Sequence, residues 1–258
     1  MNTSFKSRLR SGAPQIGIRS QLCSALAAEA IASCGYDYVY LDMEHAPNDL
    51  MSILHQANAI AAASSHTVVR LPGNDGLLMQ RLLDLGINNL VIPMVESAND
   101  AARAVAATRY PPKGNRSAAA AHRGNRFGLD EAYLGDVLER ICLIVQIESR
   151  AGLAHVSEIA AVDGVDGILF GPADLAADLG HLGNATHPEV VAAIGGGVER
   201  VRAAGKFPGM STADPKLARD WFASGCCFVS IGADLQLLTR SAHRHLEPLQ
   251  DIRIANKN

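Results

Sequence analysis

The sequence predicts a (β/α)8 TIM barrel, and three observations lead to this fold class. The chain has 258 residues, and a (β/α)8 barrel typically needs roughly 250, so we expect one domain spanning residues 1–258. Short apolar runs rich in β-branched residues alternate with Ala-rich amphipathic segments. Carboxylates follow the ends of two of these runs, where the active sites of such barrels lie.

The apolar runs are predicted to be buried parallel strands. They are Gln15–Ile18, Tyr38–Asp42, Thr67–Arg70, Asn89–Ile92, Ile141–Ile147, Gly167–Phe170, Phe207–Met210 and Phe228–Ile231. Predicted helices between or after them are Leu22–Cys34, Leu50–Ala62, Leu77–Leu85, Asp100–Thr108, Pro215–Ser224 and Leu235–Leu246, and Gly35, Gly86 and Gly225 follow three of them as C-caps. An open doubly wound sheet is the alternative, but no glycine-rich phosphate fingerprint follows the first strand.

Residues 1–14 form a short N-terminal segment that carries Lys6, Arg8 and Arg10 and no acid. It has no apolar h-region, so it does not resemble a secretory signal. We expect an exposed leader before the first strand, and a short organellar transit peptide is the alternative.

Composition limits the possible functions. Hydrophobic residues make up 48% of the chain and charged residues 19%, which is enough apolar content for a large core. The formal net charge of −3 predicts no nucleic-acid partner, and no apolar stretch approaches the roughly 18 residues needed to span a membrane. The five cysteines are odd in number and have no metal or redox spacing, so we expect a cytoplasmic protein.

Two strand-end carboxylates are the strongest functional signal. Glu148 follows the strand that ends near Ile147, and Asp174 follows the strand that ends at Phe170. An unpaired buried charge is costly, so a core role does not explain them. Two carboxylates on nearby strand ends instead predict a hard divalent cation with oxygen ligands.

Other polar residues stand at neighbouring strand ends. Asp42, Glu44 and His45 follow the second strand, and Arg70 ends the third. One isolated His or Arg would be interpreted as a helix cap or a surface ion pair. A base, a permanent cation and two carboxylates from four strands indicate an active site instead. We interpret Glu44 alone as an exposed loop carboxylate.

Six motifs, in order along the chain, resemble the HpcH/HpaI aldolase family, the metal-dependent class II aldolases that use pyruvate. The resemblance covers about Gln15 to Leu249. The motifs are Leu41–Asn48, Val68–Pro72, Val91–Met94, Arg109–Pro112, Val145–Glu148 and Gly171–Leu175.

The resemblance implies a role for each matching residue. Glu148 and Asp174 would bind the metal, which would be Mg²⁺ or Mn²⁺, with Co²⁺ as an alternative. Arg70 would contact the carbonyl oxygen of pyruvate, and Gln146 would support the metal-bound waters. His45 would transfer protons, positioned by Asp42 and by Asp84 of a neighbouring subunit. The turn Gly171, Pro172 and Ala173 would offer backbone N–H groups to the pyruvate carboxylate.

The resemblance also implies a homo-hexamer in which C-terminal helices are exchanged between subunits. Segments 122–128 and 180–184 resemble members that act on 2-oxo-3-deoxy sugar diacids, so Arg116, His122 and Arg123 would bind a distal carboxylate. Solvated loop charges are an equal alternative for these three residues. The family often has glycine where this chain has Ser117, which leaves the local backbone open.

The expected reaction is cleavage of a 4-hydroxy-2-oxo acid to pyruvate and an aldehyde, both of them small-molecule partners. A metal and a guanidinium would stabilise the enolate oxygen, and His45 or metal-bound water would take the hydroxyl proton. The other type of aldolase forms a Schiff base with a lysine. Of the five lysines (Lys6, Lys113, Lys206, Lys216, Lys257), only Lys113 follows a strand exit, and it lies in a loop.

Two other functions stay open. A related carbon–carbon lyase could act on acyl-CoA thioesters, as the relatives of the citrate lyase β-subunit do, but we find no basic site for the adenine phosphates. A non-catalytic barrel could bind sugar acids. A binder needs no base beside a metal, so His45 and Arg70 beside the two carboxylates favour the enzyme.

Overall fold

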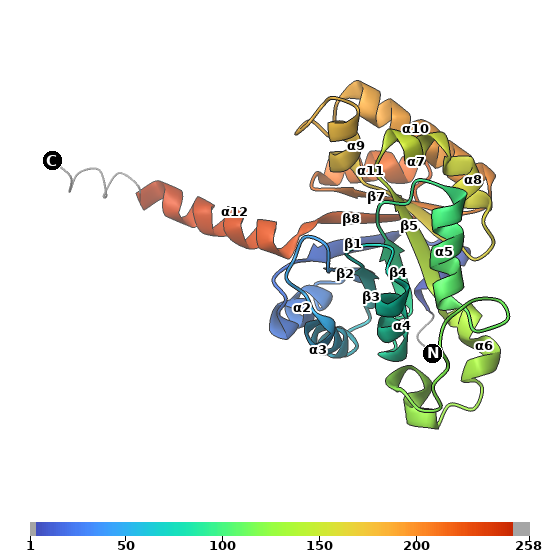
Figure 1. Ribbon diagram of the computed structural model, residues 1–258. Coiled ribbons are helices and arrows are strands. Elements are labelled where there is room, and N and C mark those ends of the chain that lie inside the picture. Colours follow the sequence, from blue (N-terminus) through green and yellow to red (C-terminus); the bar gives the residue numbers. More distant parts are fainter. Residues whose placement is uncertain (1–3, 250–258) are drawn as a thin grey trace.

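The computed structural model describes residues 4–249 and contains a closed barrel of eight parallel strands in chain order (Figure 1). The strands are β1 (Gln15–Ser20), β2 (Tyr38–Asp42), β3 (His66–Arg70), β4 (Asn89–Ile92), β5 (Cys142–Ile147), β6 (Gly167–Phe170), β7 (Phe207–Thr212) and β8 (Phe228–Ala233). β8 pairs with β1 and closes the barrel. The predicted fold class is confirmed, and strand ends differ from the predicted ones by no more than two residues.

Helices surround the barrel. They are α1 (Phe5–Arg10), α2 (Ala25–Ala32), α3 (Leu50–Ile60), α4 (Gly76–Asp84), α5 (Ala98–Thr108), η1 (Arg123–Gly128), α6 (Tyr133–Arg140), α7 (Arg150–Ala154), α8 (Val156–Ala161), α9 (Pro172–Asp178), α10 (Pro188–Ala203), α11 (Pro215–Ala223), α12 (Asp234–Leu246) and η2 (Glu247–Leu249). Side chains such as Asp75 and Asp214 accept hydrogen bonds from first-turn N–H groups, which fixes where α4 and α11 begin. None of the described helices is long and apolar enough to cross a membrane.

Two hydrophobic cores hold the fold together. The larger lies between the strands and the surrounding helices, and the smaller fills the barrel with side chains such as Tyr38, Tyr40 and Phe228. Glycines make room for these rings: a Cβ on Gly17 would lie 2.2 Å from the ring of Tyr38, and one on Gly209 would lie 2.1 Å from that of Phe228. The barrel is therefore a packed core, and only its mouth is open to ligands.

The N-terminal segment closes the other end of the barrel. We expected an exposed leader, and this is wrong for α1, where Phe5 and Leu9 are each 1% exposed. Phe5 packs edge-on against Tyr38, with ring centroids 5.2 Å apart. Lys6 Nζ donates to the carbonyl of Ile141 at 2.8 Å and lies 2.9 Å from a carboxylate oxygen of Asp166. The amphipathic α1 is thus part of the domain. Residues 1–3 of the leader lie outside the described residues.

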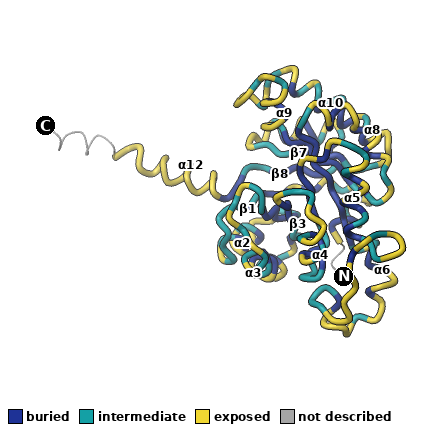
Figure 2. The backbone as a smooth tube through the Cα atoms, viewed as in Figure 1, coloured by how far each residue is buried: buried dark blue, intermediate teal, exposed yellow. Residues whose placement is uncertain are grey.

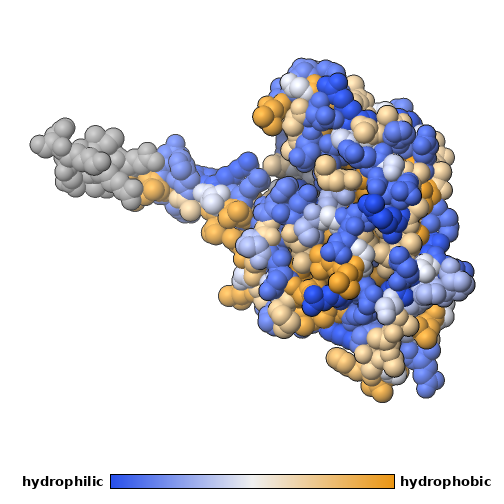
Figure 3. Space-filling model, viewed as in Figure 1, coloured by the Kyte–Doolittle hydropathy of each residue, from blue (hydrophilic) through white to orange (hydrophobic). Residues whose placement is uncertain are grey.

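The C-terminal helix α12 extends away from the barrel (Figures 1 and 2). Its apolar side chains are exposed, with Leu235 at 42%, Leu237 at 50% and Leu238 at 56%. Figure 3 shows apolar side chains on the surface of this helix. Such a face has no partner among the described residues of one chain, and the expected exchange of this helix between subunits stays a prediction.

Candidate active site

A cavity of 640 Å³ opens at the carboxyl ends of the strands. Residues from most of the strand ends line it. Those predicted from the sequence are His45, Arg70, Gln146, Gly171, Pro172, Ala173 and Asp174. The C-terminal mouth of the barrel therefore brings together residues that lie more than 120 positions apart in the chain.

Glu148 lies behind the wall that Gln146 and Gly171 form. Its carboxylate accepts hydrogen bonds from the backbone N–H of Met94, at 2.7 Å, and from the side-chain amide of Gln146. Glu148 is 4% exposed, and burial raises its pKa to about 7 although both hydrogen bonds favour the ionised form. The charges of Glu44 and Asp174 raise this pKa further. The carboxylate of Glu148 is held in place by two neutral donors, so a bound cation would stabilise its ionised form. Glu148 is therefore suited to be a cation ligand.

Asp174 stands in the first turn of α9, directly after β6, and is exposed at the cavity. The residue before this helix, Gly171, has no side chain, and a Cβ there would lie 2.8 Å from Oε2 of Glu148. Glycine at this position therefore makes room for the carboxylate of Glu148 beside the turn that leads to Asp174. Two carboxylates and no cysteine at this point form an oxygen donor set that suits a hard divalent cation.

Arg70 is held by two carboxylates. Its Nε and Nη2 donate to the carboxylate of Asp42 at 3.0 and 2.6 Å, and its Nη1 lies 2.7 Å from Oε2 of Glu44. Burial would raise the pKa of Asp42, but Arg70 holds it below its ordinary value. Burial raises the pKa of Glu44 in spite of the same guanidinium. The buried Arg70 therefore presents a fixed positive charge at the cavity.

His45 stands at the rim of the cavity, with a side chain that is 57% exposed. Its Nε2 lies 3.9 Å from Oε2 of Glu44. Asp42 accepts a hydrogen bond from the backbone N–H of His45 at 3.2 Å, so it fixes the loop and does not contact the imidazole. Glu44, interpreted from the sequence as an exposed loop carboxylate, instead lies between Arg70 and His45.

The remaining predicted residues form a cluster away from this cavity. Asp84, at the end of α4, accepts a hydrogen bond from Arg116 at 2.7 Å and lies 4.0 Å from Nε2 of His122. Arg116 is fully buried and also donates to the hydroxyl of Tyr133 at 3.1 Å. Arg123 donates to a carbonyl at the end of α4 and to Asn58. None of these four predicted residues lines the cavity of its own barrel.

The lysines are also placed away from the cavity. Lys6, Lys113 and Lys206 surround a different hollow, near α1 and the start of β7. Lys216 is exposed at the start of α11, and Lys257 lies outside the described residues. No lysine between residues 4 and 249 therefore lines the barrel mouth.

Two features of the site were not predicted from the sequence. Arg19, Ser211 and Ser230 line the side formed by β1, β7 and β8. Ser230 lies within the predicted eighth strand, and Arg19 and Ser211 each stand one residue beyond the predicted ends of the first and seventh strands. The backbone N–H of Met94, which holds Glu148, has no signal in the sequence.

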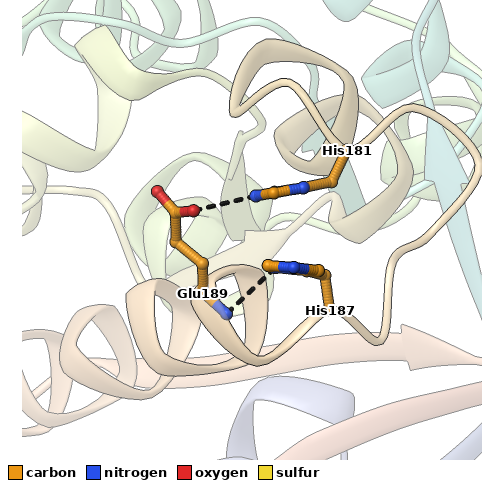
Figure 4. Close-up of side chains that lie close together, drawn as sticks. All are labelled: His181, His187 and Glu189. Carbon is orange, nitrogen blue, oxygen red and sulfur yellow. Dashed lines mark hydrogen bonds and ion pairs between the residues drawn. The ribbon is translucent and has the colours of Figure 1, made fainter.

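A compact cluster between α9 and α10 fixes another part of the wall (Figure 4). The rings of His181 and His187 stack, with centroids 3.5 Å apart, and Nε2 of His181 lies 2.8 Å from a carboxylate oxygen of Glu189. Each imidazole nitrogen binds a metal in its own ring plane, and here the two planes are within 16° of parallel. This arrangement does not suit a shared ion. It fixes the loop whose residues Gly183 and Thr186 line the cavity.

A closed parallel barrel that collects carboxylates, a guanidinium and an imidazole at its C-terminal mouth defines a barrel enzyme. A model of the HpcH/HpaI aldolase/citrate lyase family matches residues 15–241, and the chain belongs to that family. The membership expected from the six sequence motifs is confirmed.

Individual relatives agree with this assignment. The chain is 45% identical to 4-hydroxy-2-oxo-heptane-1,7-dioate aldolase of Klebsiella pneumoniae subsp. pneumoniae, over 94% of this chain and 92% of the relative. It is 48% identical to hydroxypyruvate/pyruvate aldolase of Pseudomonas aeruginosa, over 92% and 89%. A crystal structure of a family member from Burkholderia cenocepacia J2315 superposes with a TM-score of 0.90 at 40% identity, covering 95% of this chain and 98% of that one.

Proposed function

We propose that the protein is a divalent-metal-dependent aldolase that cleaves a 4-hydroxy-2-oxo acid, such as a 2-oxo-3-deoxy sugar diacid, to pyruvate and an aldehyde. The proposal rests on Asp174 and the fixed guanidinium of Arg70 at one cavity, with Glu148 directly behind the lining residues Gln146 and Gly171. The names of the two aldolase relatives support the same reaction class.

Glu148 and Asp174 would hold the metal, with Mg²⁺, Mn²⁺ or Co²⁺ as the candidates. When bound, the cation would supply Lewis-acid stabilisation of the charge that develops on the 2-oxo oxygen. Gln146 would keep the carboxylate of Glu148 oriented, since its amide donates to that carboxylate and its carbonyl accepts a 3.4 Å hydrogen bond from Tyr40.

Arg70 would bind the same 2-oxo oxygen from another side. A guanidinium that is already fixed by Asp42 needs little reorganisation as the enolate forms, which favours the transition state. The pyruvate carboxylate would lie at the start of α9. Gly171 uses its N–H in a hydrogen bond to Ile147 and Pro172 has none, so the N–H of Ala173 is the donor of that turn.

His45 would take the proton of the 4-hydroxyl group. The bond between C3 and C4 then breaks, its electron pair forms the pyruvate enolate, the aldehyde leaves, and a proton adds to C3. The ring of His45 is exposed at the rim of the cavity, so it can exchange protons with both the substrate and the solvent.

Asp84 would orient His45 across a subunit interface. It lies at the end of α4, away from the cavity of its own barrel, with Arg116 and His122 beside it. We propose a homo-hexamer in which the apolar face of α12 contacts a neighbouring subunit. The described cysteines are all free thiols, which suits a cytoplasmic location.

The proposal is tested by a pyruvate-release assay on 4-hydroxy-2-oxo acids, with and without a chelator. We expect activity that disappears with the chelator and returns with Mg²⁺, Mn²⁺ or Co²⁺. Release of pyruvate at the full rate from a metal-free sample would contradict the assignment, as would a covalent adduct trapped by borohydride in the presence of pyruvate.

A further inference from the structure

Arg19 is a cation inside the mouth of the barrel. The register of β1 against β8 shifts between Gly17 and Arg19, but the guanidinium carbon of Arg19 lies 5.8 Å from the ring centre of Tyr40, a side chain of the barrel interior, so Arg19 faces the interior. Arg19 lines the 640 Å³ cavity. In a closed barrel of eight strands, β1 stands opposite β5, the strand that precedes Glu148. Arg19 therefore lies across the cavity from the proposed metal ligands.

Two serines on neighbouring strands face the cavity beside Arg19. Ser211 of β7 and Ser230 of β8 are partners in the strand register, and both line the cavity. Nε of Arg19 and the hydroxyl oxygens of both serines are buried and have no hydrogen-bond partner within residues 4–249. Buried polar groups in native proteins are almost always paired, so three such groups on one wall indicate a polar ligand.

The nearby carboxylates are already bound by other groups. Asp42 is bound by Arg70 through both oxygens. Asp234 accepts hydrogen bonds from the hydroxyl of Ser20 and from the backbone N–H of Gln21, each at 2.8 Å. Arg70 has two carboxylates within 2.7 Å, whereas Arg19 forms no ion pair with the described chain. The positive charge of Arg19 is therefore left for a ligand.

The spacing of the two guanidinium groups limits the size of that ligand. Arg19 and Arg70 each place the guanidinium carbon 5.8 Å from the centre of the Tyr40 ring. The two carbons are thus separated by at most twice that distance. A short-chain substrate whose 2-oxo group lies at Arg70 can reach Arg19 with its other end.

We propose that Arg19, with Ser211 and Ser230, binds an anionic group, preferably a carboxylate, on the aldehyde half of the substrate. The proposal rests on the proposed aldolase function and places at this wall the negative charge of an acidic aldehyde, which is additional to the carboxylate of the pyruvate half. Within one chain it gives Arg19 the role in distal carboxylate binding that the family resemblance implied for Arg116, His122 and Arg123, none of which lines the cavity of its own barrel.

The test compares succinic semialdehyde, which carries a carboxylate, with butanal, its uncharged counterpart, as acceptors for pyruvate. The wild-type protein should prefer the carboxylated aldehyde. In Arg19→Gln the ratio of kcat/KM values should fall about tenfold or more, mainly through KM, because a charge-assisted hydrogen bond is lost. Arg19→Lys keeps the charge and should lose less. The exposed Arg103 of α5 gives a matched control, and Arg103→Gln should keep the wild-type ratio.

Succinate binding, measured by calorimetry, provides a readout that does not need catalysis. We expect Arg19→Gln to bind succinate about tenfold more weakly or worse than wild type. The role of Arg19 would be overturned if Arg19→Gln changed kcat/KM equally for both aldehydes. It would also be overturned if Arg19→Gln bound succinate as tightly as the wild type. If neither aldehyde reacts in the wild type but succinate binding still depends on Arg19, the aldolase proposal fails and the anion site stands.

Discussion

The carboxylate of Asp42 accepts two hydrogen bonds from Arg70, from Nε at 3.0 Å and from Nη2 at 2.6 Å. Both residues are almost fully buried, and their strands pair in register at these positions. A bidentate pair of this kind fixes the plane of the guanidinium, and the third nitrogen, Nη1, lies 2.7 Å from Oε2 of Glu44. The geometry explains why a lysine cannot replace Arg70 without loss.

Arg70→Lys should lower kcat/KM for pyruvate release by at least about 2.7 kcal/mol of transition-state stabilisation, the low end for losing one oxyanion donor. A lysine is a point charge that cannot bind Asp42 through two donors and still reach the enolate oxygen. Steady-state kinetics would check this, with thermal unfolding as the control for folding. Turnover near that of the wild type would mean that Arg70 serves only the structure.

Divalent cations should stabilise the protein more at pH 8 than at pH 5.5. The pKa of Glu148, raised to about 7 in the folded protein from an ordinary 4.5, makes its ionisation unfavourable in the absence of a cation. The free-energy cost of ionising Glu148 is absent below its pKa in the unfolded chain and complete above its pKa in the folded protein. Between pH 5.5 and pH 8 this cost rises by about 2 kcal/mol. A cation beside Glu148 would remove it.

Thermal unfolding with and without Mg²⁺ or Mn²⁺ at the two pH values measures this difference. Glu148→Gln is the matched control, because an amide of the same size does not ionise. A cation effect of equal size at both pH values in the wild type would place the bound ion away from Glu148.

Mixed oligomers of two variants test the proposed shared site. Asp84→Asn should lower activity with little change in metal affinity, since Asp84 lies outside the cavity of its own barrel and away from the proposed metal ligands. Mixing Asp84→Asn with His45→Ala subunits should restore a fraction of the activity, because some interfaces regain both native groups. Activity that never recovers on mixing, or a fully active monomer, would argue for sites built within single chains.

The barrel could be predicted from the sequence because its strands are buried on both faces. Continuous apolar runs such as Cys142–Ile147 stand out from the amphipathic helices, and every residue of that strand is buried. Glu148 and Asp174 could be proposed as site residues for the same reason, since a carboxylate directly after a buried strand has no place in the core.

Contacts between distant segments could not be predicted in this way. Lys6 is a polar residue in a charged segment, and nothing local indicates that carbonyls near residue 141 bind it. In the sequence Glu44 resembles a loop carboxylate, and only the pairing of β3 with β2 places Arg70 beside it. Arg19 stands one position beyond the predicted end of β1, so its place in the interior depends on the register of the closed barrel.

Phe5→Ala should destabilise the domain by about 3–5 kcal/mol, the usual range for truncating a buried phenylalanine. The ring closes the bottom of the barrel against Tyr38 and Phe228. Denaturant unfolding followed by circular dichroism measures the change, with Ser7→Ala on the exposed side of α1 as the control. A loss below about 1 kcal/mol would show that α1 is dispensable for stability.

The exchange of the pyruvate methyl protons for deuterium, followed by NMR in heavy water, tests the central claim most directly. Enolate formation at Glu148, Asp174 and Arg70 predicts rapid exchange in the wild type with Mg²⁺ or Mn²⁺, in the absence of any aldehyde. Exchange should stop with a chelator and in Glu148→Gln. Exchange that continues at the full rate in the chelated protein would contradict the account.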